Sequence, residues 1–403
     1  MIVNLEQIRE AASHLGPVIR PTPVERSDAL SRLVGRDVLL KPEYRQRTGS
    51  FKIRGAYNFV SRLAAGGEVV AASAGNHAQG VALAASLTGS RATIFMPANA
   101  ALPKVEATRA YGATVKLVGD VVDDCMAGAR EYADSSGAVF VPPFDDPLVI
   151  AGQGTVGLEI AAEAPDGDTG PAHVLVPVGG GGLIAGVATA LAHTRRSVKV
   201  IGVEAAGADA MRRSVAQRKA VTLDAVTTMA DGIAVKAPSE LTLSHVLAYV
   251  DEVVTVTEEE ISHALLLLLE RAKAVVEPAG AVGLAALLAG KVPGKSPVLA
   301  VLSGGNVDPL LLSKLIDHGL SAAGRYLVLR IVLGDRPGAL ASLTEAVAKL
   351  GLNVLSVEHH RSGVRVGVDE VEVMLTLETR DPQHREEVAA ALARAGFKVE
   401  LVG

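Results

Sequence analysis

Lys52 is the residue with the most direct chemical potential in the sequence, and it lies in the segment TGSFKIRGA, residues 48–56. A run with helical character, residues 55–60, follows, so the lysine is expected just inside a helix start. The helix dipole, the nearby cations Arg47 and Arg54, and any burial would all lower the pKa of its amine. The neutral amine that results is the form that attacks carbonyl groups. A solvated lysine at a helix end is the simpler alternative, and this segment by itself does not exclude it.

A run of four glycines, Gly179 to Gly182, separates a predicted strand from a helix expected to begin at Leu183. The backbone N–H groups of such a turn can approach a ligand closely, and at a helix N-terminus they favour a phosphate. A glycine-rich turn that binds nothing is the alternative. The run also differs from the dinucleotide-binding fingerprint, because the acidic residue expected on a following strand is missing.

Two further segments end predicted strands: SAGNHAQG, residues 73–80, and SGGN, residues 303–306. In the first, a serine and the N–H groups that follow it could hold a carboxylate. In the second, a serine hydroxyl lies at the carboxyl end of a strand. A helix cap and an ordinary turn are the respective alternatives. Together the four segments supply an amine, a phosphate cradle, an anion-binding helix start and a hydroxyl, which suggests a phosphorylated aldehyde held as a Schiff base.

The elements that must position these residues alternate between strand and helix in two series. The first series runs from about residue 37 to residue 150, and the second from about 151 to 320. Their short apolar strands are expected at residues 68–73, 92–96, 114–118, 138–141, 173–178, 198–204, 252–256 and 298–303. This rhythm predicts an α/β protein with two doubly wound parallel sheets, and a ligand in the cleft between them.

The character of the chain changes near residues 318–324, which are small and polar and predict a linker. The tail that follows has the order βαββαβ, a ferredoxin-like unit. We therefore expect a catalytic domain at residues 1–320, with a smaller subdomain at about 45–150. A linker at 321–325 and a separate domain at 326–403 would complete the chain.

Composition narrows the class of protein further. Hydrophobic residues make up 49% of the 403 positions and charged residues 21%, as in globular proteins. The net charge of −5 gives no basic surface for nucleic acid or an anionic membrane. The single cysteine, Cys125, excludes an intrachain disulfide and a cysteine metal cluster. The longest apolar run, residues 264–269, is too short to span a bilayer, and the N-terminus does not resemble a signal peptide, so a cytoplasmic protein is expected.

The four segments, in this order, resemble the threonine dehydratase (threonine ammonia-lyase) family of fold-type II, tryptophan-synthase-β-like pyridoxal-phosphate enzymes. The resemblance covers residues 5–320 and extends to DGIAV, residues 231–235, and EPAGA, residues 277–281. The tail resembles a single ACT domain, a small amino-acid-sensing module. The resemblance implies conversion of L-threonine, and of L-serine, to a 2-oxo acid and ammonia, with isoleucine biosynthesis as one setting.

Carried over by position, the family's motifs assign a role to each predicted site residue. Lys52 would bind pyridoxal phosphate and act as the catalytic base, and Phe51 would pack on the pyridine ring. Asn76 would bind the ring hydroxyl, and Ser303 the ring nitrogen. The phosphate would be held by Gly179, Gly180, Gly181, Gly182 and Leu183, and the substrate carboxylate by Ser73, Ala74, Gly75 and His77.

Two of these positions bear on the type of reaction. A neutral hydroxyl from Ser303 need not keep the ring nitrogen protonated, which favours β-elimination. Similar serine racemases have a second serine where this chain has Ala74, and alanine cannot transfer a proton, so one-sided elimination is expected. The alternatives are a serine or 3-hydroxyaspartate dehydratase, a racemase, a β-replacement enzyme, and an amino-acid-binding regulator built on an inactive scaffold.

Metal, effector and assembly complete the expectations. Some family members bind a divalent cation through a carboxylate equivalent to Glu204, but here the aligned second ligand is Ala210, with Asp209 beside it. No metal is predicted, although a monovalent or divalent cation near Glu204 stays an alternative. The ACT resemblance implies an amino-acid effector, isoleucine or valine, at Pro337, Gly338 and Asn353. It also implies a homo-oligomer, either a dimer or a tetramer.

Overall fold

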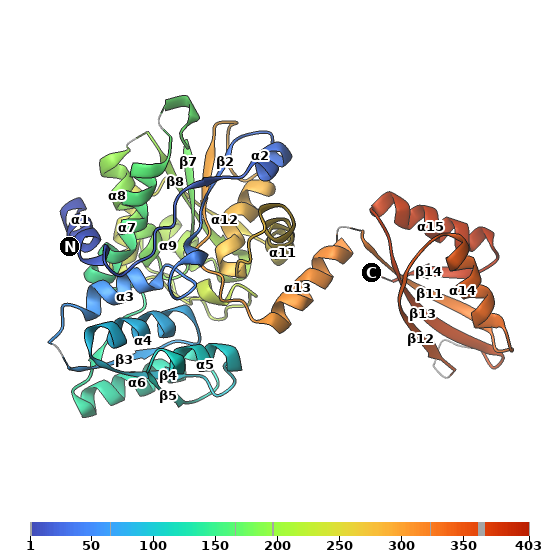
Figure 1. Cartoon of the computed structure of the whole chain (residues 1–403), viewed down its shortest axis with the longest axis horizontal. Coiled ribbons are helices and arrows are strands. Elements are labelled where there is room, and N and C mark those ends of the chain that lie inside the picture. Colours follow the sequence, from blue (N-terminus) through green and yellow to red (C-terminus); the bar gives the residue numbers. More distant parts are fainter. Residues whose placement is uncertain are drawn as a thin grey trace. The chain divides into compact units, whose positions relative to one another are not determined.

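The computed structural model describes residues 2–402 except 65, 166, 196, 323 and 362–366. The chain divides into two compact units, Met1–Leu311 and Leu312–Gly403, and each is described by itself (Figure 1). In the described part of the chain, no helix combines the length and the apolar composition needed to cross a membrane.

A six-stranded sheet forms the larger lobe of the first unit, in the order β1-β2-β10-β7-β8-β9. Every neighbouring pair is parallel except β1 and β2. The strands are β1 (Glu25–Arg26), β2 (Val38–Lys41), β7 (His173–Pro177), β8 (Lys199–Ala205), β9 (Glu252–Val256) and β10 (Val298–Val301). The helices of this lobe are α1 (Leu5–Leu15), α2 (Asp28–Val34), α7 (Pro147–Glu163), α8 (Gly182–Thr194), α9 (Ala210–Gln217), α10 (Glu240–Tyr249), α11 (Glu258–Leu267) and α12 (Pro278–Leu288).

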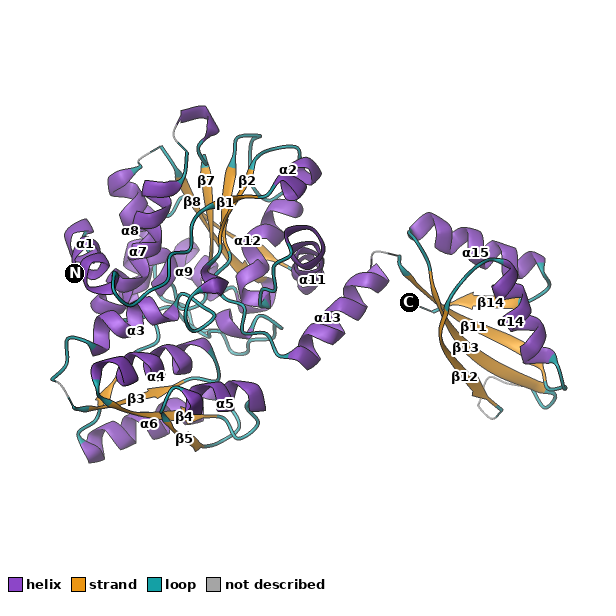
Figure 2. Ribbon diagram, in the orientation of Figure 1, coloured by secondary structure: helices purple, strands orange, loops and turns teal. Residues whose placement is uncertain are grey.

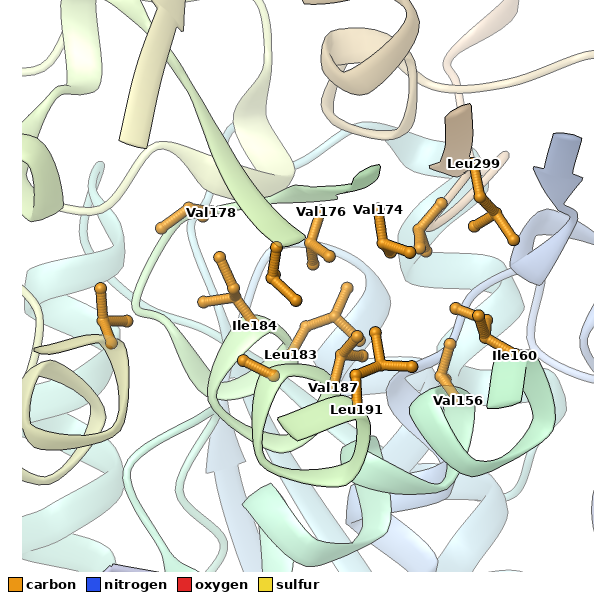
Figure 3. Packing of buried hydrophobic residues seen from close by; sticks show 14 of the residues in the cluster. Val156, Ile160, Val174, Val176, Val178, Leu183, Ile184, Val187, Leu191 and Leu299 are labelled. Atoms are coloured by element: carbon orange, nitrogen blue, oxygen red, sulfur yellow. The ribbon is translucent and has the colours of Figure 1, made fainter. Parts of the chain in front are cut away.

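The core of this lobe holds the glycine run in place. Strand β7 is buried along its whole length and helix α8 is apolar on all sides, as expected for elements covered on every face. Figure 3 shows their side chains interlocked with those of α7, including Val176, Leu183, Val187 and Ile160. Each such side chain contributes about 1.5–3 kcal/mol when fully buried. The turn that connects β7 to α8 is therefore anchored at both ends.

The smaller lobe carries a four-stranded parallel sheet in the order β5-β4-β3-β6 (Figure 2). Its strands are β3 (Glu68–Ala72), β4 (Arg91–Met96), β5 (Thr114–Leu117) and β6 (Val139–Phe140), and its helices are α3 (Lys52–Val60), α4 (Asn76–Thr88), α5 (Leu102–Ala110) and α6 (Val122–Ser136). Helix α3 packs against both α4 and α7, so it joins the two lobes. Strand β6 is shorter than the predicted strand at residues 138–141.

The second unit has an antiparallel sheet in the order β12-β13-β11-β14, with two helices. Its elements are β11 (Tyr326–Gly334), α14 (Ala339–Lys349), β12 (Val354–His360), β13 (Glu370–Glu378), α15 (Pro382–Arg394) and β14 (Lys398–Leu401). Alternate residues of β11 and β13 are buried, which gives the sheet one apolar face. Helix α13 (Pro309–Ala322) extends into the predicted linker, and Ala323 lies outside the described residues.

The expected fold class is confirmed: two parallel α/β sheets are followed by a βαββαβ unit. Short helical turns complete the first unit: η1 (Glu43–Arg45), η2 (Gly167–Thr169), η3 (Ala206–Ala208), η4 (Asp231–Ile233) and η5 (Leu268–Ala272). The strand–helix rhythm does not include the edge strand β1 or its antiparallel partner β2, and β2 joins the larger sheet although its residues fall in the first predicted series.

Candidate active site

Lys52 is the first residue of α3, and the segment before it is tied to the turn after β10. Ser50 forms an isolated antiparallel bridge with Gly304, and the Phe51 N–H donates to the Ser303 carbonyl at 3.1 Å. The bridge brings two of the predicted segments, 48–56 and 303–306, side by side. Both Ser50 and Ser303 are buried.

The Lys52 amine is held in surroundings that favour its neutral form. Its Nζ donates to the Pro143 carbonyl at 2.9 Å. Burial lowers the pKa of Lys52 to about 8, and the charge of Glu277 opposes that shift. The expected influence of Arg54 is offset, because Arg54 is ion-paired with Glu43 and Glu159. Burial, rather than neighbouring cations, makes this lysine unusual.

The glycine run, residues 179–182, packs against Phe144. Phe144 follows Pro143, whose carbonyl accepts the hydrogen bond from Lys52. A side chain at Gly180 would overlap the Phe144 ring, and a Cβ at Gly182 would lie 2.9 Å from the Phe144 Cβ. Gly181, with φ of +92°, is the N-cap of α8 and provides no side-chain cap. The first hydrogen bond within α8 runs from the Ala185 N–H to the Gly181 carbonyl. The N–H groups of residues 182–184 therefore precede the internal ladder, as in an anion-binding helix start.

The start of α4 presents a second set of such N–H groups. Ser73 Oγ accepts the N–H of Gly75 at 3.1 Å, and Gly75 is an N-cap without a side-chain cap. The Gln79 N–H makes the first intrahelical bond, to Gly75. The predicted carboxylate-binding residues, including Ala74, therefore lie at a helix start where three backbone N–H groups make no hydrogen bond within the helix.

His77, also predicted near the substrate carboxylate, is buried and neutral. Its Nε2 lies 2.9 Å from the Val141 carbonyl, which can only accept, so that nitrogen carries the proton. Burial, followed by the charge of Lys52, lowers the pKa of His77 to about 3. His77 is therefore suited to hold the loop at Val141 rather than to take up a proton near neutral pH.

Asn76 forms hydrogen bonds with two residues that are not among the predicted site residues, Glu277 and Asn306. Its Nδ2 donates to Glu277 Oε1 at 2.6 Å, and its Oδ1 accepts from Asn306 Nδ2 at 2.7 Å. Glu277 is buried and is the N-cap of the apolar helix α12. A carboxylate inside the apolar stretch AVVEPAGAV is the sequence signal that could have identified it.

Glu204, the alternative cation ligand, is used by the protein backbone. Its two carboxylate oxygens accept the N–H groups of Met211 and Arg212 at 2.8 and 2.9 Å, at the start of α9. Asp209 pairs with Arg213 at 2.8 Å. Among the described residues, no group of three or more histidine, cysteine or acidic side chains is placed to hold a metal.

The predicted effector residues lie in the second unit. Gly338, which follows Pro337, has φ of +88° and is the N-cap of α14 without a side-chain cap. Asn353 Nδ2 donates to Glu378 Oε2 at 3.0 Å. The glycine turn therefore leaves the first N–H groups of α14 without a capping side chain.

Two family models match the chain. The model of the pyridoxal-phosphate dependent enzymes matches residues 15–304, and that of the ACT domain matches residues 327–399. The chain belongs to the pyridoxal-phosphate-dependent enzymes. The expected pyridoxal-phosphate cofactor and the ACT tail are thereby confirmed.

Relatives and solved structures agree with this family. The chain is 48% identical to an L-threonine ammonia-lyase of Thermotoga maritima, over 100% of both chains. It is 47% identical to an L-threonine ammonia-lyase of Geobacter sulfurreducens, over 98% of both. The crystal structure of a threonine deaminase from T.th. matches with a TM-score of 0.72 and 41% identity, covering 76% of this chain and 99% of that one. A maize serine racemase matches at 0.73 and 36%, covering 80% and 99%.

The residues present fit pyridoxal phosphate. A phosphate needs N–H donors without obstructing side chains, and the Gly181 turn at the start of α8 supplies them. An aldehyde reacts with a neutral amine, and the lowered pKa of Lys52 makes that form easier to reach. The Lys52 amine contacts the loop that carries Phe144, and the glycine turn packs on the Phe144 side chain.

Proposed function

We propose that this enzyme is an L-threonine ammonia-lyase, which converts L-threonine to 2-oxobutyrate and L-serine to pyruvate, with release of ammonia. The observation that carries the proposal is the 48% identity to an L-threonine ammonia-lyase over the full chain, ACT tail included. A half-buried lysine with a lowered pKa at the helix start supports it.

In this proposal the cofactor is held by Lys52, Phe51, residues 179–183, Asn76 and Ser303. Lys52 binds the aldehyde, and Phe51 packs on the ring. The backbone of residues 179–183 binds the phosphate, Asn76 the ring hydroxyl and Ser303 the ring nitrogen. Bound pyridoxal phosphate supplies an electron sink for the substrate carbon that loses its proton.

Lys52 moves that proton in the proposed reaction. A pKa of about 8 leaves a substantial fraction of free Lys52 neutral at mildly alkaline pH, so Nζ can accept the proton of Cα. The residues around Gly75 hold the substrate carboxylate through backbone N–H groups. Loss of the Cα proton and of the β-hydroxyl gives an enamine, and water converts the enamine to a 2-oxo acid and ammonium.

Ala74 favours elimination over racemisation in this scheme. A racemase needs a second proton-transferring group on the opposite face of Cα, and a methyl side chain cannot serve. A racemase is nevertheless the second candidate, because a serine racemase is among the solved structures that resemble the chain. A serine or 3-hydroxyaspartate dehydratase is a further variant of the same chemistry.

The ACT domain is proposed to make the enzyme responsive to a branched-chain amino acid bound at Pro337, Gly338 and Asn353. We also propose a homo-oligomer, a dimer or a tetramer, because ACT domains usually bind effectors between two copies. A cytoplasmic location fits the free, buried Cys125, which stays reduced there.

The test is a 2-oxo-acid assay with L-threonine, L-serine and 3-hydroxyaspartate, each with and without isoleucine or valine. We expect L-threonine to be turned over, and Lys52→Ala to lower kcat by at least about a thousandfold, since one group both binds the cofactor and moves the proton. D-Serine or D-threonine formed as fast as oxo acid would favour the racemase. Failure of borohydride to fix the cofactor on Lys52 would instead favour the inactive regulator.

A further inference from the structure

Both the nitrogen and the oxygen of the Asn76 side-chain amide form hydrogen bonds with the protein, and these fix the orientation of the amide. One N–H of Nδ2 goes to Glu277 Oε1, and the oxygen accepts from Asn306 Nδ2. If the amide turned over, its oxygen would face a carboxylate oxygen and its NH₂ group would face the NH₂ of Asn306. Both contacts would then be repulsive, so a single orientation of Asn76 is selected.

Glycines shape the space in which Glu277 meets this amide. A Cβ at Gly304 would overlap the Glu277 carboxylate and lie 3.1 Å from Asn76 Nδ2. A Cβ at Gly232 would lie 3.5 Å from Glu277 Oε1. The Glu277 N–H donates to the Gly304 carbonyl at 3.0 Å, which ties α12 to the same turn. The carboxylate therefore fills a notch between two glycines.

Asn306 is itself fixed to the segment that carries the lysine. Its Nδ2 also donates to the Thr48 carbonyl at 2.7 Å. The same nitrogen thus links the Lys52 segment to Asn76. Among the described residues, the structure shows no protein acceptor for the second N–H of Asn76, so it is available to a ligand.

We propose that Glu277 is a positioning residue for the cofactor. By accepting one N–H of Asn76, it directs the other toward the ring of pyridoxal phosphate, and Asn306 prevents the amide from turning over. This inference rests on the proposed cofactor role of Asn76 and is independent of which amino acid is the substrate.

The charges around Glu277 add a pH dependence. Burial, followed by the charge of Asp231, raises the pKa of Glu277 to about 7. The Asn76 amide and the charges of Lys104 and Lys52 oppose this shift. Glu277 therefore gains a proton as the pH falls through 7, and a neutral carboxyl is a weaker acceptor than a carboxylate. The hold on Asn76 should loosen over this range.

The experiment titrates the cofactor-free, full-length protein with pyridoxal phosphate and follows the absorption spectrum, without substrate. We expect Glu277→Ala to raise the dissociation constant about tenfold and Glu277→Gln, which keeps an acceptor oxygen, about twofold to threefold. Between pH 8 and 6, the ratio of the wild-type to the Glu277→Gln constant should rise, because only the wild type has a titrating acceptor at this position.

A double-mutant cycle tests whether Glu277 acts through Asn76. In an Asn76→Ala background, Glu277→Ala should cause no further loss of affinity. Glu260→Gln is the matched control, since Glu260 is a partly buried glutamate of the same lobe whose partners, the Thr257 N–H and Lys291, are not among the predicted site residues; this variant should bind the cofactor as the wild type does.

Two results would overturn the proposal: additive effects of the two substitutions, or wild-type affinity and spectra in both Glu277 variants across pH 6–8. If Glu277→Ala does not fold, Glu277→Gln decides, because it preserves the shape of the side chain. Normal cofactor binding without threonine turnover would contradict the proposed function and leave this inference standing.

Discussion

Two buried polar clusters, one around Arg54 and one around Glu277, differ in how their charges are balanced. In the first, Arg54 donates to Glu43 and Glu159, and Lys41 pairs with Glu159 and Glu163.

In the second, Glu277 contacts the Asn76 amide and the backbone of Gly304, and the charge of Asp231 repels its carboxylate. Each charged group of the first cluster has a partner of opposite charge, and in this sense the cluster is balanced; its Arg54 belongs to α3. In the second cluster, the Glu277 carboxyl has a pKa of about 7 and therefore changes its protonation state near neutral pH. Balanced charges indicate a structural role here, and the unbalanced one indicates function.

Removing the guanidinium of the balanced cluster should have the largest effect on stability. Arg54→Met would leave the buried charge of Glu43 unpaired and Glu159 with Lys41 as its remaining cation, and we expect the free energy of unfolding to fall by about 3–5 kcal/mol in a denaturant titration. Arg62→Met is the control, since Arg62 pairs with an exposed Glu10, and it should cost less than about 1 kcal/mol. Equal losses in the two variants would contradict the distinction between the clusters.

The unbalanced cluster should reveal itself in the pH dependence of stability. The pKa of Glu277 in the folded protein, about 7, exceeds its ordinary value of 4.5, so the folded state binds the proton more tightly. The contribution of Glu277 to the free energy of unfolding is full below pH 4.5. It falls by roughly 3 kcal/mol as the pH rises through 7. Glu277→Gln lacks this titration. Unfolding of the cofactor-free proteins between pH 4.5 and 8 measures the difference, and parallel curves would argue against a raised pKa.

The smallest effects on the pH dependence of stability should come from charged residues that shift the pKa of Glu277 without a hydrogen bond to it. Lys104 and Asp231 form an ion pair between the lobes, and a second such pair joins Lys236 to Asp123. Lys104 lowers the pKa of Glu277 and Asp231 raises it. The midpoint, the pH at which half of the Glu277 contribution to stability is lost, should therefore rise in Lys104→Met and fall in Asp231→Asn.

Lys236→Met serves as the control for that pair of variants. It breaks an exposed ion pair between the same lobes, but it has no part in the pKa shift of Glu277. We expect no change in the midpoint. Shifts in the same direction for Lys104→Met and Asp231→Asn would mean that the pair acts only as a link between lobes.

The features that the sequence predicts well are local ones. The strand–helix rhythm and the alternation along β11 come from the periodicity of neighbouring residues, and both match the observed sheets. Lys52 and the glycine run are also local motifs, and their placement at the starts of α3 and α8 agrees with the expectation.

The features that it does not predict depend on distant pairs. Glu277 meets Asn76 across 201 positions of sequence, and Arg54 meets Glu159 across 105. The sequence suggests that Arg54 acts on the lysine through its charge, and only the fold shows that this charge is already balanced. The predicted ends of β6 are wrong for a related reason, because pairing with β3 sets them. The roles of the predicted site residues stay predictions until they are tested.

The notch at Gly304 has a consequence for how this protein can evolve. The volume that a side chain would occupy there is filled by the carboxylate of Glu277, so Gly304 cannot gain a side chain while Glu277 is in place. A random substitution at 304 is expected to be lost under selection unless residue 277 shortens at the same time. In a mutational library, survivors with a side chain at 304 should therefore also carry a shorter residue at 277, whereas changes at 277 can occur with Gly304 unchanged.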